Sequence, residues 1–295
     1  MLEKLNRQYG SNSVSFVSGA GNLPCVKINN AFASCVIALH GAHILSYIPQ
    51  GGQDVLFVSD NAVYAEGKPI RGGIPICAPF FGGYPIPDKY PAHGFVRLVS
   101  WRIADVRQEG QYDVIELALD GAELPPDRNF GFDFRYTVAV GPSLRAALTV
   151  TNRTKAEVAF SAALHSYFAV GAIAETSVAN LENCSCFDAL DKTEKLQSGE
   201  ITFDCEVDRI YQDTEAETVI HDRAGNRDIF VSKSGSCSTV VWNPWIDKSR
   251  RMADFGDKDY LKMVCVETAN AGTDKRVIAP GKNHVLALEI RCNAL

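Results

Sequence analysis

Residues 132–140 read FDFRYTVAV and residues 144–152 read LRAALTVTN, with the short segment GPS between them. In the first run an apolar side chain stands at every second position from Phe132 to Val140, which is the period of a half-buried strand. A turn segment followed by a second strand-like run predicts a strand that returns alongside the first. We therefore expect an antiparallel hairpin over residues 132–152.

Strand-like segments of the same kind recur along the chain between Gly, Pro and Asn turn signals. They are VKIN, ASCVIALH, DVIELALD, AEVAFSAALHSYFAV, GEITFDCEVDRIY, STVVWN, MVCVETA and HVLALEIRC. The best candidate helix is the short segment SRRMADF, residues 249–255. Many short strands between turn signals are typical of antiparallel sandwiches and barrels. We expect an all-β protein, and the absence of a linker or repeat favours one domain over residues 1–295.

The composition indicates a globular protein, and its charge bears on the class of partner. Of the 295 residues, 46% are hydrophobic and 22% charged, which provides ample material for a core. A formal charge of −6 argues against nucleic acid as a partner, because phosphate-backbone binding requires a basic face. The N-terminal segment has no apolar stretch of the signal-peptide kind, and no run is long enough to span a membrane. We expect a cytoplasmic protein without membrane attachment.

Neither the cysteines nor the paired histidines predict a metal site. The nine cysteines include no CxxC pair, so we expect reduced thiols that behave as small buried hydrophobes. His40 and His43 in HGAH have a spacing seen in some metal sites, yet no third ligand stands out, and a turn is the favoured interpretation. We expect neither a metal nor an organic cofactor.

Strand parity draws attention to His165. In AEVAFSAALHSYFAV, the side chains of Ala159, Ser161, Ala163 and His165 share one face of the predicted strand. Small residues beside a histidine suit a face that lines a pocket for a bulky ligand. A histidine satisfied within the core is the alternative, and parity alone favours it.

Glu267 follows an almost wholly apolar run in KMVCVETA, which predicts a carboxylate at or near a buried strand end. Desolvation raises the pKa of such a carboxylate toward a value useful for a general base. A structural partner for an arginine or a backbone amide is the alternative. The residue pattern favours the two equally.

Two arginines bracket the turn-rich segment RGGIPICAPFFGGYPIPDKYPAHGFVR, residues 71–97. Arg71 and Arg97 offer rigid forks of donors suited to phosphate or carboxylate, and His93 stands just before the second of them. A surface ion pair is the alternative for either arginine alone. Asp208, in EVDRIY, falls on the polar side of its strand, where a solvated face is the default interpretation.

Six motifs of the chain resemble those of the hexose-6-phosphate mutarotases in the aldose 1-epimerase superfamily. In chain order they are RGGIPICAPFFG, PAHGFVR, LHSYFAV, EVDRIY, WNPW and VCVET. The resemblance covers most of the chain and implies a single large antiparallel β-sandwich of the galactose-mutarotase type. It implies an isomerase that interconverts the α and β anomers of glucose 6-phosphate or a related hexose 6-phosphate without a cofactor. The expected partner is this phosphosugar, and we expect a monomer or a weak homodimer.

The resemblance also implies roles for individual residues. The catalytic pair falls on Glu267, expected as the base toward the C1 hydroxyl, and His165, expected as the acid toward the ring oxygen. Proton removal from that hydroxyl and protonation of the ring oxygen open the ring, and the roles reverse on closure. The expected substrate contacts are Arg71, Arg97, Asp208 and His93.

The chain departs from the family pattern at two places. Ala92 stands where some relatives carry a glutamine, so a sugar-hydroxyl contact there is absent or replaced. Relatives often place a tryptophan in the CAPFFGGY segment, which leaves Phe80, Phe81 and Tyr84 as the expected aromatic wall of the sugar site. Two alternatives stay open: an aldose 1-epimerase for free sugars, for which paired arginines are superfluous, and a non-catalytic carbohydrate-binding domain, which needs no proton pair.

Overall fold

The structure is a computed structural model that describes residues 1–84 and 89–295. It contains the predicted hairpin as β8 (Phe132–Val140) and β9 (Leu144–Asn152), which pair in register over their whole length. Burial alternates along β8 as the sequence pattern predicts, because every second side chain faces the core. The predicted loop over residues 71–97 includes residues 85–88, which lie outside the described residues.

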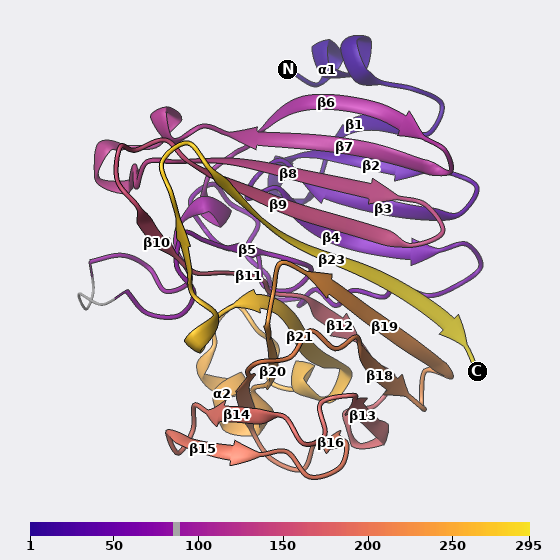
Figure 1. Cartoon of the computed structure of the whole chain (residues 1–295). Coiled ribbons are helices and arrows are strands. Elements are labelled where there is room, and N and C mark those ends of the chain that lie inside the picture. The colour runs from indigo at the N-terminus through magenta and orange to yellow at the C-terminus, as the bar shows by residue number, and fades with distance from the viewer. Residues whose placement is uncertain (85–88) are drawn as a thin grey trace.

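The described strands form two large and two small antiparallel sheets (Figure 1). The nine-stranded sheet has the order β16 (Ile201–Thr202), β13 (Thr176–Ala179), β18 (Thr218–Asp222), β19 (Arg227–Ser234), β23 (Asn283–Ala294), β9, β8, β7 (Tyr112–Leu119), β6 (Arg102–Glu109). The eight-stranded sheet has the order β15 (Thr193–Leu196), β14 (Ser185–Asp188), β17 (Val207–Tyr211), β20 (Ser238–Asn243), β21 (Met263–Asn270), β11 (Ala162–Leu164), β5 (Ile76–Cys77), and β12 (Tyr167–Ala169) also pairs with β21. The small sheets comprise β1 (Val14–Ser18), β2 (Pro24–Asn29), β3 (Ala33–Ala38), β4 (His43–Pro49), and the pair β10 (Val158–Phe160) and β22 (Arg276–Ile278).

One large hydrophobic core lies between these sheets. It includes Tyr136 and Leu148 from the nine-stranded sheet, Ile37 from the four-stranded sheet and Val266 from the eight-stranded sheet. Figure 1 shows the strands of the four-stranded sheet behind those of the nine-stranded sheet, as two layers. Packing of sheets through a shared apolar layer is the arrangement of a β-sandwich, and the all-β fold class is confirmed. The single domain over residues 1–295 stays a prediction.

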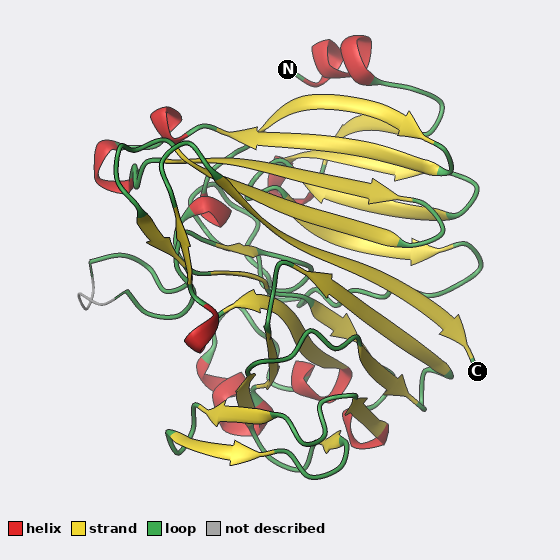
Figure 2. Ribbon diagram, in the orientation of Figure 1, coloured by secondary structure: helices red, strands yellow, loops and turns green. Residues whose placement is uncertain are grey.

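The helices differ from the sequence prediction (Figure 2). The helix expected at residues 249–255 is wrong in its bounds, because α2 spans Trp245–Arg251: the Asn243 side chain accepts the backbone N–H of Trp245, and Met252 is already extended. A second helix, α1 (Leu2–Tyr9), was not predicted. The 3-10 helices span Ala20–Asn22, Val96–Leu98, Gly121–Glu123, Pro126–Arg128, Ile173–Glu175, Asp259–Lys262 and Gly272–Asp274. No helix within the described ranges is long and apolar enough to cross a membrane.

The long strand predicted around AEVAFSAALHSYFAV is broken into β10, β11 and β12. The break falls at Ser161, whose N–H donates to the carbonyl of Pro79 at 3.2 Å and whose hydroxyl accepts the N–H of Phe81 at 2.9 Å. These bonds replace ladder bonds, so β10 pairs with β22 while β11 joins β21 and β5. The chain thereby crosses from one sheet to another just before His165.

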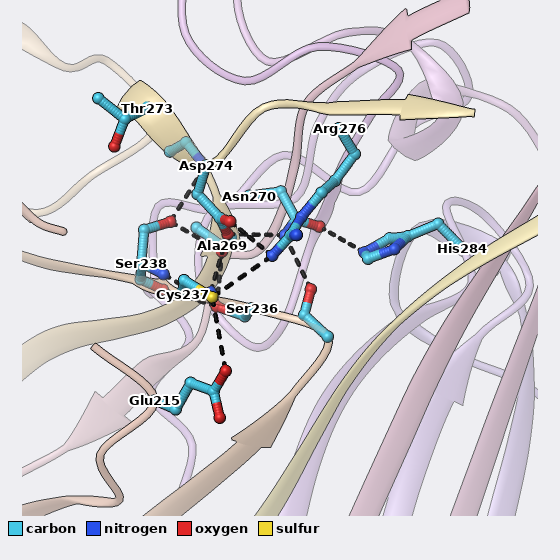
Figure 3. A network of polar contacts seen from close by, with 12 residues as sticks. Glu215, Ser236, Cys237, Ser238, Ala269, Asn270, Thr273, Asp274, Arg276 and His284 are labelled. Carbon is cyan, nitrogen blue, oxygen red and sulfur yellow. Dashed lines mark hydrogen bonds and ion pairs between the residues drawn. The ribbon is translucent and has the colours of Figure 1, made fainter. Parts of the chain in front are cut away.

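A polar network holds the ends of β20 and β21 together (Figure 3). The Asn270 side chain donates to the Gly235 carbonyl and to Asp274, both at 2.8 Å. Asp274 also accepts the backbone N–H of Cys237 at 2.9 Å, and His284 lies 3.0 Å from the Asn270 side-chain oxygen. The network satisfies buried polar groups at the end of the strand that carries Glu267, and so fixes that strand against its neighbour.

The cysteine prediction holds for five residues and fails for four. All nine thiols are free. Cys25, Cys35, Cys77, Cys186 and Cys265 are buried, but Cys184, Cys237 and Cys292 are only half-buried and Cys205 is exposed. Cys205 lies in the bend between β16 and β17, where no sheet covers its side chain.

Candidate active site

The candidate site lies on the face of the eight-stranded sheet that points away from the sandwich core. All residues of β21 are buried. Val264 and Val266 belong to the large core between the sheets, whereas Cys265 belongs to a separate cluster. Because side chains alternate along a strand, Glu267 shares the outer face with Cys265.

Two small apolar clusters flank Glu267 on this outer face. One cluster contains Phe57, Tyr167, Trp242, Phe255, Met263 and Cys265. The other contains Cys77, Ala163, Val240, Ala269 and Ala271, with Phe81 packed against it. Val240 lies directly opposite Glu267 on β20. The carboxyl group therefore lies between apolar side chains. Ala163, which strand parity places on the face of small residues that ends at His165, belongs to one of these two clusters.

The structure brings His165 and Glu267 together on this outer face. The His165 Nε2 atom lies 3.4 Å from Glu267 Oε1, and the two residues are 7% and 2% exposed. The remaining polar atoms of the pair, His165 Nδ1 and Glu267 Oε2, are buried without a hydrogen-bond partner among the described residues. Buried polar groups ordinarily have partners, so these two atoms are well placed to bond to a ligand.

The electrostatics of the pair favour its uncharged form. Burial, supported by the negative charge of Asp208, raises the pKa of Glu267 well above its usual value, although Arg97 opposes the rise. Burial is the main cause that lowers the pKa of His165 well below its usual value, and the nearby His93 and Arg97 lower this pKa further. Each shift favours the uncharged form of its group, the protonated carboxyl of Glu267 and the neutral imidazole of His165.

The His165 ring is fixed by packing on three sides. It stacks on the Tyr167 ring, with centroids 4.8 Å apart and the planes only 8° apart. The rings of Trp242 and His93 meet it edge-on, with centroids 6.0 Å and 5.7 Å away. The backbone N–H of His165 donates to the carbonyl of Pro75 at 3.1 Å. Both the ring plane and its position are thereby set before any ligand binds.

His93 adopts a strained backbone conformation next to the pair. Its φ is 64°, which a non-glycine residue rarely adopts. Its N–H donates to the Gly82 carbonyl at 2.7 Å, and its Nδ1 accepts the Gly82 N–H at 3.4 Å. The next residue, Gly94, has a φ of 72° and approaches Ala78 so closely that a Cβ would lie 1.9 Å from its carbonyl oxygen. Burial, reinforced by nearby arginines, lowers the pKa of His93 to about 3, so this ring is neutral.

Arg71 is already largely engaged by protein groups. Its Nε and Nη2 atoms donate to the two carboxylate oxygens of Asp254 at 3.2 Å, and its Nη1 donates to the Tyr167 hydroxyl at 3.1 Å. Within the described residues, three of the five N–H groups of the guanidinium are thus used, and two remain for a ligand. Arg71 also connects the Asp254 loop to the ring on which His165 stacks.

Arg97 is less engaged than Arg71. It lies on the 3-10 helix Val96–Leu98, and its Nη2 donates to the carbonyl of Ala92 at 3.0 Å. Its Nε atom is buried without a hydrogen-bond partner among residues 1–84 and 89–295. Of the two predicted arginines, Arg97 has the more donors to offer an anion.

The default interpretation of Asp208 as part of a solvated face is wrong. Asp208 lies on β17, opposite Trp242 of β20. Its side chain is 28% exposed, because α2 packs over it. Lys248 of α2 places its Nζ atom 3.3 Å from Asp208 Oδ2 and 2.9 Å from Glu206 Oε1. Burial nevertheless raises the pKa of Asp208, with Lys248 opposing the rise. No pattern in the sequence points to Lys248, since its partner Asp208 lies 40 residues away.

The aromatic wall is only partly where the sequence analysis expects it. Phe81 lies against His93, with ring centroids 4.9 Å apart. Phe80 and Tyr84 instead pack on each other at 5.0 Å, in an aromatic cluster that also contains Tyr90, Phe95 and Phe130. Phe80 is 9% exposed and belongs to the main core. Of the three expected wall residues, Phe81 alone has a described contact with a predicted site residue.

The paired histidines of HGAH serve as backbone partners. The Nε2 atom of His40 lies 2.8 Å from the Lys68 carbonyl, and that of His43 lies 2.7 Å from the Gly72 carbonyl. Burial lowers the pKa of His43 to about 3. No group of three or more His, Cys, Asp or Glu side chains in the described parts of the chain is arranged to hold a metal ion.

Comparisons with known proteins identify the family. A sequence model of the aldose 1-epimerase family matches residues 24–291. The chain belongs to the aldose 1-epimerase family. A "Putative glucose-6-phosphate 1-epimerase" of Cenchrus ciliaris is 34% identical over 275 residues, which cover 89% of this chain and 83% of the relative. A protein of the same name from Escherichia coli K12 is 32% identical, over 91% of this chain and 90% of the relative.

Solved structures place this aldose 1-epimerase family member in the galactose mutarotase-like fold. The crystal structure of a "putative mutarotase" from Salmonella typhimurium superposes with a TM-score of 0.88 at 31% identity, over 97% of this chain and 95% of that one. A galactose mutarotase-like protein from Clostridium acetobutylicum shares the fold with a TM-score of 0.71 at 14% identity, over 97% and 100% of the two chains. The family is one of sugar epimerases and mutarotases, which are isomerases.

Proposed function

We propose that this member of the aldose 1-epimerase family is a hexose-6-phosphate mutarotase, which interconverts the α and β anomers of glucose 6-phosphate or a related hexose 6-phosphate. The observation that carries the proposal is the buried contact between His165 and Glu267, 3.4 Å apart, in which each residue keeps one polar atom that no described residue bonds to. The proposal also agrees with the name shared by the Cenchrus ciliaris and Escherichia coli relatives, glucose-6-phosphate 1-epimerase.

Ring opening needs one group that takes a proton and one that gives a proton. In the proposed reaction Glu267 removes the proton of the C1 hydroxyl while His165 protonates the ring oxygen, and the roles reverse when the ring recloses. Because burial favours the proton on Glu267, this assignment requires the proton to pass to His165 when the sugar binds. The bound sugar would stabilise the form in which His165 carries the proton, because its C1 hydroxyl donates a hydrogen bond to Glu267 and its ring oxygen accepts one from His165.

Both steps conserve the single proton of the pair. The proton that Glu267 takes from the C1 hydroxyl returns to the aldehyde oxygen on closure, and the proton that His165 gives to the ring oxygen returns from the C5 hydroxyl. The C1–C2 bond rotates in the open aldehyde, so either anomer can form. No electron leaves the sugar, and each positioned proton carrier supplies about 10²–10⁴-fold acceleration.

The remaining residues fit the other groups of a phosphosugar. Arg97, with its unpartnered Nε atom, and the two N–H groups left on Arg71 are proposed to bind the phosphate. Asp208 and His93 are proposed to hold sugar hydroxyls, and Phe81 adds an apolar surface beside His93. A free sugar has no group that requires the arginines.

Anomer-exchange NMR on the purified protein tests the proposal. Glucose 6-phosphate, galactose 6-phosphate and the two free sugars are compared at equal concentration. We expect catalysed exchange for a phosphosugar, much weaker exchange for the free sugars, and its loss in Glu267→Gln. Equal exchange of free and phosphorylated sugars would favour a free-sugar aldose 1-epimerase, and binding without exchange would favour a carbohydrate-binding domain.

A further inference from the structure

Helix α2 lies over one side of the proposed sugar site and contacts it through Lys248. The Lys248 Nζ atom lies 2.9 Å from Glu206, 3.3 Å from Asp208 and 5.6 Å from the centre of the Trp242 ring. Trp242 is the cross-strand partner of Asp208 and also meets the His165 ring edge-on. Lys248 is therefore in contact with a proposed sugar-binding carboxylate and with a ring that positions the proton pair.

The surroundings of Asp208 are otherwise unfavourable to a negative charge. The titratable groups that face it are Lys248 from α2, Glu206 from its own segment, Asp188 from β14, and Glu267 and Cys265 from β21. The neighbouring Arg209 donates to Asp188 at 3.0 Å and so offsets that carboxylate. Lys248 is the cation in direct contact with Asp208.

We propose that Lys248 is a positioning residue, which keeps the Asp208 carboxylate ionised and oriented so that it can accept hydrogen bonds from sugar hydroxyls. The inference rests on the proposed function, since it assumes a sugar at Asp208. Sequence comparison with the family motifs does not point to Lys248, which lies outside all six. Its role follows from the fold, in which α2 places a lysine between two carboxylates.

The sign of the expected effect follows from the charges. Burial raises the pKa of Asp208 and Lys248 opposes the rise, so removal of the lysine raises that pKa further. Asp208 then becomes protonated at a higher pH and loses acceptor capacity over that range. An opposite charge in contact shifts a carboxylate by about 1–3 units, and a partly exposed pair belongs at the lower end. We expect a shift of about one unit, and hence a KM that is roughly tenfold higher at pH values well below the parent pKa of Asp208.

Lys248→Met removes the charge and keeps an unbranched side chain over Trp242. Lys248→Arg restores the charge and serves as the rescue variant. The matched control is Lys262→Met: the Lys262 Nζ atom also lies near two carboxylates and a ring, 3.3 Å from Asp259, 3.8 Å from Asp60 and 5.7 Å from the Phe57 ring centre, and it has no contact with Asp208 among the described ion pairs.

Two measurements decide the inference. The first is the pKa of Asp208 in the unliganded protein, measured by titration of its carboxyl ¹³C signal. This pKa should rise by about one unit in Lys248→Met and return to the parent value in Lys248→Arg. The second is the pH dependence of KM for glucose 6-phosphate, whose acid limb should move by the same amount while kcat above the limb stays near the parent value. Lys262→Met should move neither.

An unchanged Asp208 titration in folded Lys248→Met would overturn the inference, as would a KM increase that is the same at every pH. The carboxyl titration does not depend on catalysis. If the parent protein exchanges no sugar, the proposed function fails, whereas the titration still decides whether Lys248 controls the charge of Asp208.

Discussion

Replacement of Arg97 by alanine should separate phosphosugar from free-sugar chemistry. Within the described residues, the hydrogen bond of this arginine is to the Ala92 carbonyl, and its Nε atom is buried without a partner. Its side chain can therefore give a ligand phosphate charge-assisted hydrogen bonds without first breaking an ion pair. Removal of the side chain costs the phosphosugar these bonds and leaves no buried carboxylate of the described residues uncompensated.

The size of the effect follows from these contacts. A hydrogen bond to a charged group contributes about 1.5–3 kcal/mol, so the loss of one such bond lowers kcat/KM for glucose 6-phosphate by about tenfold to hundredfold. Free glucose should lose no such contribution, because it has no group for this bond to reach. If the phosphate also orients the sugar, kcat falls together with affinity.

Arg71→Ala provides the internal comparison. This change leaves the Asp254 carboxylate without its arginine partner and removes the hydrogen-bond donor to the Tyr167 hydroxyl. The ring of Tyr167 is the one that stacks on His165. We therefore expect it to slow both sugars and to discriminate between them less than Arg97→Ala does. The two variants are compared by kcat/KM from anomer-exchange NMR, with circular dichroism to check folding.

Competition supplies a second readout for the same arginine. Inorganic phosphate should inhibit the parent protein, less so at high ionic strength, and should inhibit Arg97→Ala only weakly. Should Arg97→Ala slow glucose and glucose 6-phosphate to the same degree, the arginine is a general sugar contact or scaffold, and the phosphosugar proposal loses its main physical support.

Three further outcomes are expected. His165→Ala and Glu267→Gln should each abolish most anomer exchange while the circular dichroism spectrum stays that of the parent, and near-normal exchange in either folded variant would contradict the assigned roles. The pH profile of kcat/KM should be bell-shaped: activity falls on the acid side when the His165 imidazole is protonated, at a pH below the usual histidine pKa because burial lowers it, and on the alkaline side when Glu267 loses its proton, at a pH above the usual glutamate pKa because burial raises it. Phe134→Ala should lower the free energy of unfolding by about 3–5 kcal/mol in denaturant titrations, since this ring is 1% exposed in the main core; a loss below about 1 kcal/mol would contradict that packing.

The local part of the fold was predictable because its signals are local. Alternation along FDFRYTVAV depends on which side chains face the core, and β8 has this pattern throughout. The break at Ser161 was not predictable, because it arises from hydrogen bonds to Pro79 and Phe81, residues about 80 positions away. The same reason explains α2, whose start depends on the Asn243 side chain rather than on helical periodicity.

The candidate site shows the same division. Burial of Glu267 and the small face leading to His165 could be inferred from strand patterns, and the family resemblance supplied their pairing. The roles of Asp254 and Lys248 could not be inferred, since each acts on a residue far away in sequence. Asp208 shows the limit of parity: burial along β17 does not alternate strictly, and Lys248 of α2 lies against the Asp208 carboxylate.

The charges of the site suggest why an uncharged proton pair and an uncommitted arginine occur together. Arg71 is offset by Asp254, and Lys248 by Asp208 and Glu206, so the positive charge least offset by described carboxylates is that of Arg97. That charge lowers the pKa of both Glu267 and His165. A phosphate bound at Arg97 would offset it and so raise the proton affinity of both members of the pair. Under the proposed function, the phosphorylated substrate therefore helps to keep the single proton on the catalytic pair, which a free sugar cannot do.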